Sequence, residues 1–196
     1  GGSPMDTIPD LLFYDYAFSA IGGGVGDVNG DGYGDLCMPM HLPDSASVWT
    51  VVYYGGPDVD NVPDVYLLDE YGERTAALQK VTCGDCNGDG ISDIVTGDGS
   101  LVYGDIVYVY LGGPWFNPFP DAYVTIYSTI FEFGYTVSTG DVNGDGRDEL
   151  LVTARNYFNF FRGRVYLYSG PEEWIDYGAA VGPEELTRTP GWYKLE

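Results

Sequence analysis

Short runs of β-branched and aromatic residues alternate along the chain with clusters of Gly, Asp, Asn and Pro. The most apolar runs are Val48–Tyr54, Ile106–Leu111 and Val165–Tyr168, and Gly and Pro follow each of them closely. Near-continuous apolar runs of this length are typical of strands that are covered on both faces. The Gly-Gly-Pro sequences after them predict tight turns.

These runs recur at a regular interval. The segment 52–57 (Val-Tyr-Tyr-Gly-Gly-Pro) returns at 109–114 as Val-Tyr-Leu-Gly-Gly-Pro and at 167–171 as Leu-Tyr-Ser-Gly-Pro. Pro followed by an acid precedes a strand-like run at Pro9, Pro63, Pro120 and Pro183. Agreement between separate landmarks indicates an internal repeat, which decides the fold.

Each repeat is expected to contain four strands. The first runs into a polar loop, the second leaves that loop, the third is the apolar run and the fourth follows Pro-Asp. The first strand is clearest at 134–139; the second strands are expected at 36–40, 94–96 and 150–154, and the fourth at 65–68, 122–126 and 185–187.

Four short antiparallel strands per repeat, stacked side by side, predict an all-β chain built of β-propeller blades. We expect three four-stranded blades at about 10–68, 69–126 and 127–188, within a domain at 10–190, plus an extra outer strand at 11–14. Residues 1–9 are expected to be a linker and 191–196 a tail. Since propellers have about four to eight blades, the three belong either to a larger ring or to a ring completed by several chains.

The composition agrees with an all-β fold and excludes some classes of binding partner. The 18 Tyr and 29 Gly favour strands and turns over helices. The formal charge is −22 with only eight Lys and Arg, which argues against nucleic acid or an anionic membrane as a partner. No apolar run is long enough to span a bilayer, and no signal peptide is recognised.

The three cysteines allow two interpretations. Cys86 takes the place of Val28 and Val142 in the repeat, so we expect it to be a small buried apolar residue. The other interpretation is a disulfide between Cys83 and Cys86.

Acidic nine-residue loops connect the first and second strands of every repeat. They begin at 27, 85 and 141, so consecutive loops start 58 and 56 residues apart. Each carries Asp at position 1, Asn at 3, Asp at 5 and an acid at 9, with Gly at 4 and 6. The side-chain ligands expected from this pattern are Asp27, Asn29, Asp31, Asp35, Asp85, Asn87, Asp89, Asp93, Asp141, Asn143, Asp145 and Glu149.

Alternating carboxylates and amides in a tight loop are the ligands that Ca²⁺ prefers. Position 7 would add a backbone carbonyl oxygen, from Tyr33, Ile91 and Arg147. We therefore expect three calcium sites. An EF-hand would need a Glu at position 12, where Met38, Thr96 and Val152 stand, and no helical pattern follows the loops. The alternative is that the loops are simply turns, which Asp and Asn readily form.

With these loops, the sequence resembles the FG-GAP repeats of the integrin alpha-subunit propeller and its bacterial relatives. The Phe-Gly of the family matches Phe133-Gly134, and Tyr-Gly-Gly-Pro, Leu-Gly-Gly-Pro and Ser-Gly-Pro resemble its second segment. The resemblance covers about 10–188. It implies the calcium ligands named above and a ring of seven blades. The first two repeats depart from the pattern, because Phe18 is followed by Ser19 and Tyr71-Gly72 lies further upstream.

Aromatic residues gather on the rim that we expect opposite the calcium loops. The candidate ligand-binding residues are Tyr157, Phe158, Phe160 and Phe161. Apolar loop residues in number often mark an interaction surface. The alternative is that they cap the blades or face neighbouring blades.

We expect a calcium-stabilised binding or adhesion module, secreted or at the cell surface, whose partner is a protein or a glycan and which could form a homo-oligomer. A fragment of a carbohydrate-active enzyme and a structural spacer are the alternatives. The sequence weighs against an enzyme, since its one His, His41, lies in a Pro-flanked segment and no nucleophile elbow, zinc motif or phosphate loop is found.

Overall fold

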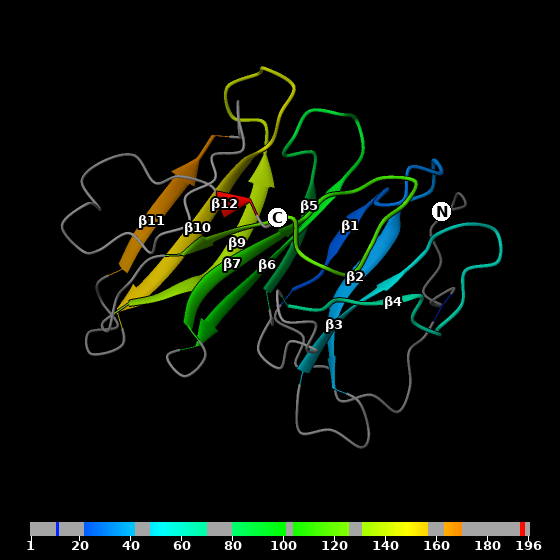
Figure 1. Cartoon of the computed structure of the whole chain (residues 1–196), viewed down its shortest axis with the longest axis horizontal. Helices are drawn as coiled ribbons and strands as arrows, with labels where there is room; N and C mark the ends of the chain where they lie inside the picture. Colours follow the sequence, from blue (N-terminus) through cyan, green and yellow to red (C-terminus); the bar gives the residue numbers. More distant parts are fainter. Residues whose placement is uncertain are drawn as a thin grey trace, which may run out of the picture.

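The computed structural model describes residues 22–41, 48–69, 80–100, 104–125, 131–156, 163–169 and 193–194, together with Leu11. Within these residues all regular secondary structure is β, and it forms three antiparallel sheets and no helix (Figure 1). The all-β prediction is confirmed.

The first sheet contains the four strands expected for the first repeat. Its order follows the chain, and it consists of β1 (Gly24–Gly26), β2 (Asp35–His41), β3 (Val48–Tyr53) and β4 (Val65–Tyr66). β3 is buried at nearly every position, as its unbroken apolar pattern predicts.

The second sheet repeats this arrangement and adds a strand. Its four consecutive strands are β5 (Lys80–Gly84), β6 (Asp93–Ser100), β7 (Gly104–Tyr110) and β8 (Ala122–Thr125). A fifth strand, β12 (Tyr193–Lys194), pairs antiparallel with β8. β12 lies in the segment that we expected to be a tail, and nothing in its sequence indicated this pairing.

The third sheet has three strands in the described part of the chain: β9 (Phe131–Gly140), β10 (Glu149–Asn156) and β11 (Gly163–Tyr168). The fourth strand expected at 185–187 lies outside the described residues, as does the extra strand expected at 11–14 apart from Leu11.

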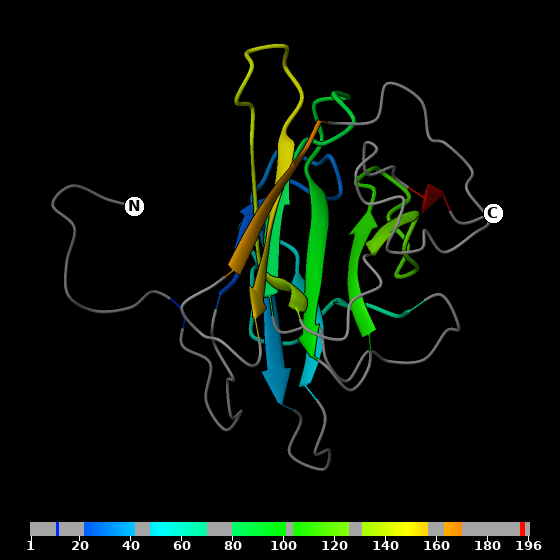
Figure 2. The ribbon, with the colours of Figure 1, turned by 90° about the vertical axis from the view of Figure 1, so that its left-hand side faces the viewer.

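The three sheets stack side by side, with hydrophobic clusters between neighbours (Figures 1 and 2). Between the second and third sheets, Val107 and Val109 of β7 belong to the same buried cluster as Leu150 and Val152 of β10. Between the first and second, Val52 joins Tyr108 and Tyr110. The described sheets do not close a ring; they form a stack of partial propeller blades.

The Phe133-Gly134 pair has a clear structural role. Phe133 is fully buried against the rings of Tyr166 and Tyr168. The register of β9 against β10 then shifts, because Thr153 pairs with Thr136 and the next residue pairs with Phe133. Gly134 lies in this bulge with φ of 80°, a conformation that favours glycine.

Candidate metal centre: three acidic loops

The three acidic loops lie along one rim of the stack, where each joins the first strand of a sheet to the second (Figure 1). Backbone contacts hold successive loops together. Ser92 N donates a hydrogen bond to Asp27 O at 2.9 Å, and Asp148 N donates to Asp85 O at 2.7 Å. The repeat therefore brings the expected ligands into a row.

The carboxylate of the first acid in each loop accepts hydrogen bonds from backbone N–H groups of the same loop. In the first loop, Asp27 Oδ1 accepts the Gly30 N–H at 2.7 Å and Asp27 Oδ2 accepts the Gly32 N–H at 2.8 Å. Gly30 and Gly32 have φ of 75° and 91°, which explains why glycine stands at both positions. Asp85 and Asp141 accept the corresponding N–H groups in their own loops.

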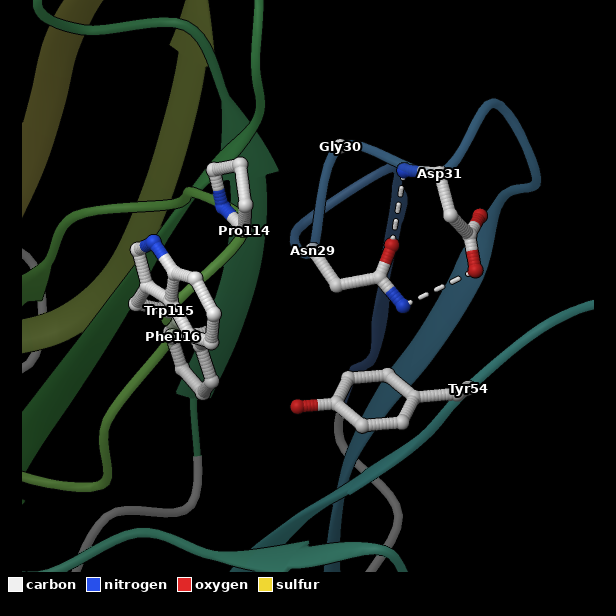
Figure 3. Close-up of a pocket in the computed structure, with 7 residues that line it drawn as sticks. All are labelled: Asn29, Gly30, Asp31, Tyr54, Pro114, Trp115 and Phe116. Atoms are coloured by element: carbon white, nitrogen blue, oxygen red, sulfur yellow. Dashed lines mark hydrogen bonds between the residues drawn. The ribbon is translucent and has the colours of Figure 1, made fainter.

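The middle residues of each loop are joined directly. Asn29 Oδ1 accepts the Asp31 N–H at 2.9 Å, and Asn29 Nδ2 donates to Asp31 Oδ2 at 3.0 Å (Figure 3). Asp31 Oδ1 accepts the Tyr33 N–H at 2.8 Å. The second and third loops repeat all three bonds.

The acid at position 9 ties the loop to a second turn. Asp35 is buried, and its Oδ2 accepts the Val28 N–H at 2.8 Å while its Oδ1 accepts the Gly55 N–H at 2.7 Å. Asp93 is held in the same way by Cys86 and Gly112. The link to the Gly-Gly-Pro turn was not foreseen from the sequence. Its signal was the similar interval between this acid and the first Gly of the turn, 20 residues in the first repeat and 19 in the second.

The third loop closes differently. Glu149 Oε2 accepts the Val142 N–H at 2.7 Å, and Glu149 Oε1 accepts a hydrogen bond from the Asn143 side chain at 2.5 Å. The extra methylene of Glu149 brings its carboxylate to the amide at position 3.

The carboxylates of the loops sit in contrasting electrostatic environments. Burial raises the pKa of Asp93 to about 7, and nearby Asp89 and Asp85 add to this, although hydrogen bonds from Gly112 and Cys86 oppose it. Burial likewise raises the pKa of Asp35. Asp141 is exposed, and the N–H groups of Gly146 and Gly144 lower its pKa. The buried closing acids are thus the ones that a positive charge would help most.

The donor set fits a hard cation, because each loop offers three carboxylates, an amide oxygen and a backbone carbonyl. In the described part of the chain, no three acidic, His or Cys side chains converge on one point. Each carboxylate oxygen instead accepts backbone or side-chain N–H groups, as the alternative of simple turns predicts. A carboxylate oxygen has two lone pairs, so an oxygen that accepts one N–H, such as either oxygen of Asp31, keeps the capacity to bind a cation. Oδ1 of Asp27 and its equivalents accept two N–H groups each, and there the cation would have to replace one of them.

The cysteines and the aromatic candidates were also singled out from the sequence. All three cysteines are free thiols, and Cys86 is fully buried in the core between the second and third sheets, as expected. Burial raises the pKa of the Cys86 thiol. The aromatic candidates Tyr157, Phe158, Phe160 and Phe161 lie outside the described residues. No helix of the described chain is long and apolar enough to cross a membrane.

Comparison with known proteins agrees with the fold. The FG-GAP repeat family model matches residues 133–168, which span β9, the third loop, β10 and β11. This confirms the resemblance for that segment, so the chain carries an FG-GAP repeat.

Three relatives have significant similarity. Phosphatidylinositol-glycan-specific phospholipase D is 29% identical over 150 residues in Mus musculus and 30% identical over 151 residues in Bos taurus, covering 65% and 64% of this chain. Integrin alpha-5 of Xenopus laevis is 25% identical over 185 residues, covering 88% of this chain. In each case the match spans 17% of the relative's length.

Proposed function

Because this chain carries an FG-GAP repeat, we propose that it is a propeller-type binding or adhesion module whose three acidic loops bind Ca²⁺. The supporting observation is that all three loops carry an oxygen-bearing side chain at positions 1, 3, 5 and 9, and that the acid at position 1 accepts the same N–H groups in each. Turns alone do not require three carboxylates in each of three equivalent loops.

The bound ion would act on charge and on packing. The residues that would hold it are the side chains at positions 1, 3, 5 and 9 and the carbonyl at position 7 of each loop. A divalent cation offsets repulsion among three acids in one short turn. Since Asp35 and Asp93 also bind Gly55 and Gly112, an ion there would stabilise two turns of a repeat together.

The proposed location is extracellular or at the cell surface. Modular sites of low affinity suit the millimolar calcium found outside cells. The strongly acidic chain, with formal charge −22, would also benefit from counterions there.

The proposed partner of the module is a protein or a glycan that binds the rim opposite the acidic loops. The module itself is proposed to be non-catalytic. Similarity to a phospholipase D covers 17% of that enzyme and lies in this repeat-containing region, so it favours a shared module rather than a shared active site. The alternatives are a fragment of a carbohydrate-active enzyme and a structural spacer. Binding assays would distinguish both from a binding module.

Ring completion is part of the proposal. Leu167 of β11 is 53% exposed, whereas Val109 and Val52, which occupy the same place in the other repeats, are fully buried by a neighbouring sheet. The outer face of the third sheet is thus suited to a further blade, from the same protein or from a second copy. Sedimentation with and without calcium would show whether copies associate.

Isothermal titration calorimetry tests the metal proposal. We expect about three Ca²⁺ per chain and much weaker binding of Mg²⁺, which demands stricter geometry. Each of Asp31→Asn, Asp89→Asn and Asp145→Asn should remove one site. The matched control Asp58→Asn changes an exposed acid outside the loops and should retain all three. Absence of calcium binding would favour the simple-turn alternative.

A further inference from the structure

A cleft opens on the rim of the acidic loops, between the first and second repeats. Its volume is about 580 Å³. Its walls are the loop residues Asn29, Gly30 and Asp31, with Tyr54 below them, on one side and Pro114, Trp115 and Phe116 on the other (Figure 3). This cleft lies on the rim opposite the one proposed above for the partner.

The cleft is held open by backbone contacts between the repeats. Gly113 N donates to Val28 O at 2.9 Å, which anchors the turn of the second repeat on the first loop. Phe116 N then donates to Gly113 O at 3.0 Å and fixes the turn itself. The aromatic wall therefore stands at a set distance from the acidic wall before any ligand arrives.

The aromatic wall is unusually accessible. Trp115 is 92% exposed, the most exposed of the large hydrophobic side chains in the described chain. Trp115 lines the cleft, and in Figure 3 the Tyr54 hydroxyl points across it toward the Trp115 and Phe116 rings. An indole that is left in water beside a cleft is a surface for stacking rather than a part of the core.

The charge at the cleft is negative. Asp31 is the charged residue among those that line it, and a second acid, Asp64, accepts the N–H of the lining residue Tyr54 at 2.7 Å. In Figure 3 the Asp31 carboxylate lies beyond the Asn29 side chain as seen from Trp115. Among the residues that the structure describes, no Lys or Arg lines the cleft, and the whole chain has a formal charge of −22. If the first loop also holds Ca²⁺, its three carboxylates and the ion still sum to a negative charge.

We propose that this cleft binds the cationic side chain of a basic peptide, an arginine or a lysine, between the Trp115 ring and the acidic loop. A cation over an indole face is attracted by the ring quadrupole, and the acidic loop with Asp31 on the opposite side, within a chain of formal charge −22, complements the same charge. Neutral sugars would gain the stacking but not the charge attraction. This inference rests on the proposed function in treating the chain as a binding module, and it adds a site and a ligand chemistry.

The experiment uses the whole chain, labelled with ¹⁵N, at fixed saturating calcium. The probe is the peptide acetyl-Gly-Arg-Gly-amide, and the controls are the same peptide with neutral citrulline and an uncharged trisaccharide. We expect the arginine peptide to shift the Gly30 amide and the Trp115 indole resonances. The citrulline peptide should bind about fivefold or more weakly, and added salt should weaken the arginine peptide.

Two variants distinguish binding in the cleft from a general attraction of the basic peptide to the acidic chain. Trp115→Ala should weaken the arginine peptide about fivefold, read at the Gly30 amide, without loss of folding because the ring is exposed. Phe119→Ala is the matched control, since Phe119 is 47% exposed near the same turn but does not line the cleft. Its affinity should equal that of the unmodified chain.

Three outcomes would overturn the inference: equal binding of the citrulline peptide, equal effects of the two variants, or shifts produced by the trisaccharide alone. Calcium titration of the same samples is read separately. A chain that binds calcium but not the peptide would contradict only the proposal for the cleft. A chain that binds the peptide but no calcium would support the cleft and contradict the metal sites.

Discussion

Equivalent residues of the second and third repeats meet opposite surroundings. Val109 in β7 is fully buried, and Leu167, which takes its place in β11, is 53% exposed. Cys86 at position 2 of the second loop is fully buried, whereas Val142 at position 2 of the third is 70% exposed. The inner repeat is packed on its far side by the next sheet, and the third sheet presents that side to solvent.

The comparison separates what a repeat does for itself from what its neighbour does for it. The loop hydrogen bonds made by the acid at position 1 are present in both repeats. Burial of position 2 and of the third strand depends on the adjacent sheet. Local sequence therefore builds each loop, and stacking supplies the core, as expected for repeats that contact only their neighbours.

A glycine pair gives the largest expected contrast. A Cβ added at Gly84 would lie 2.3 Å from Asp148 Oδ2 and 2.5 Å from Thr139 Oγ1 of the next repeat, whereas at Gly140, the equivalent position, it would meet nothing within 4 Å. We expect Gly84→Ala to lower the free energy of unfolding by about 3 kcal/mol through overpacking and Gly140→Ala by less than about 0.5 kcal/mol. Urea denaturation measures both, and equal losses would mean that the sheets do not pack as described.

The second position of the loops gives an intermediate contrast. Val28 is fully buried between repeats, so Val28→Ala should lower the free energy of unfolding by about 2 kcal/mol, from lost burial and the cavity left behind. Val142→Ala removes methyl groups that are already in solvent and should change it by less than about 0.5 kcal/mol. If Val142→Ala proves as costly, an additional partner must cover that face.

A polar contact between repeats should have the smallest effect. Asp148 Oδ2 accepts the Asp85 N–H at 3.0 Å. Asp148→Ala should lower the free energy of unfolding by about 1 kcal/mol, because a half-buried N–H loses its acceptor. Thermal denaturation measures this change. Asp148→Asn keeps an oxygen at this place and serves as the control; it should restore most of the loss.

Much of this arrangement could be predicted from sequence. The strands after each loop and the apolar third strands were located correctly, because the period and the run of β-branched residues act locally. The burial of Cys86 followed from its alignment with Val28. By contrast, the pairing of β12 with β8 involves residues far apart along the chain, and neither partner carries a pattern that specifies the other.

The site was predicted only in part. The positions of the loop acids were clear from their spacing, and their hydrogen bonds follow the same spacing. The exposed Trp115 was missed, since its role depends on a turn of one repeat lying against the loop of another. The ligation expected of the loop residues stays a prediction, because the same oxygens also satisfy backbone N–H groups.

Thermal unfolding of the whole chain in excess calcium and in EDTA tests the central claim most directly. An ion that binds only the folded state adds about 2.7 kcal/mol per site at a hundredfold excess over Kd, which raises Tm by at least about 5 °C for a chain of this size. We predict such a rise with Ca²⁺, its loss in EDTA, its return on adding Ca²⁺ back, and a smaller effect of Mg²⁺. Superimposable melting curves in calcium and in EDTA would contradict the proposal that the acidic loops bind calcium.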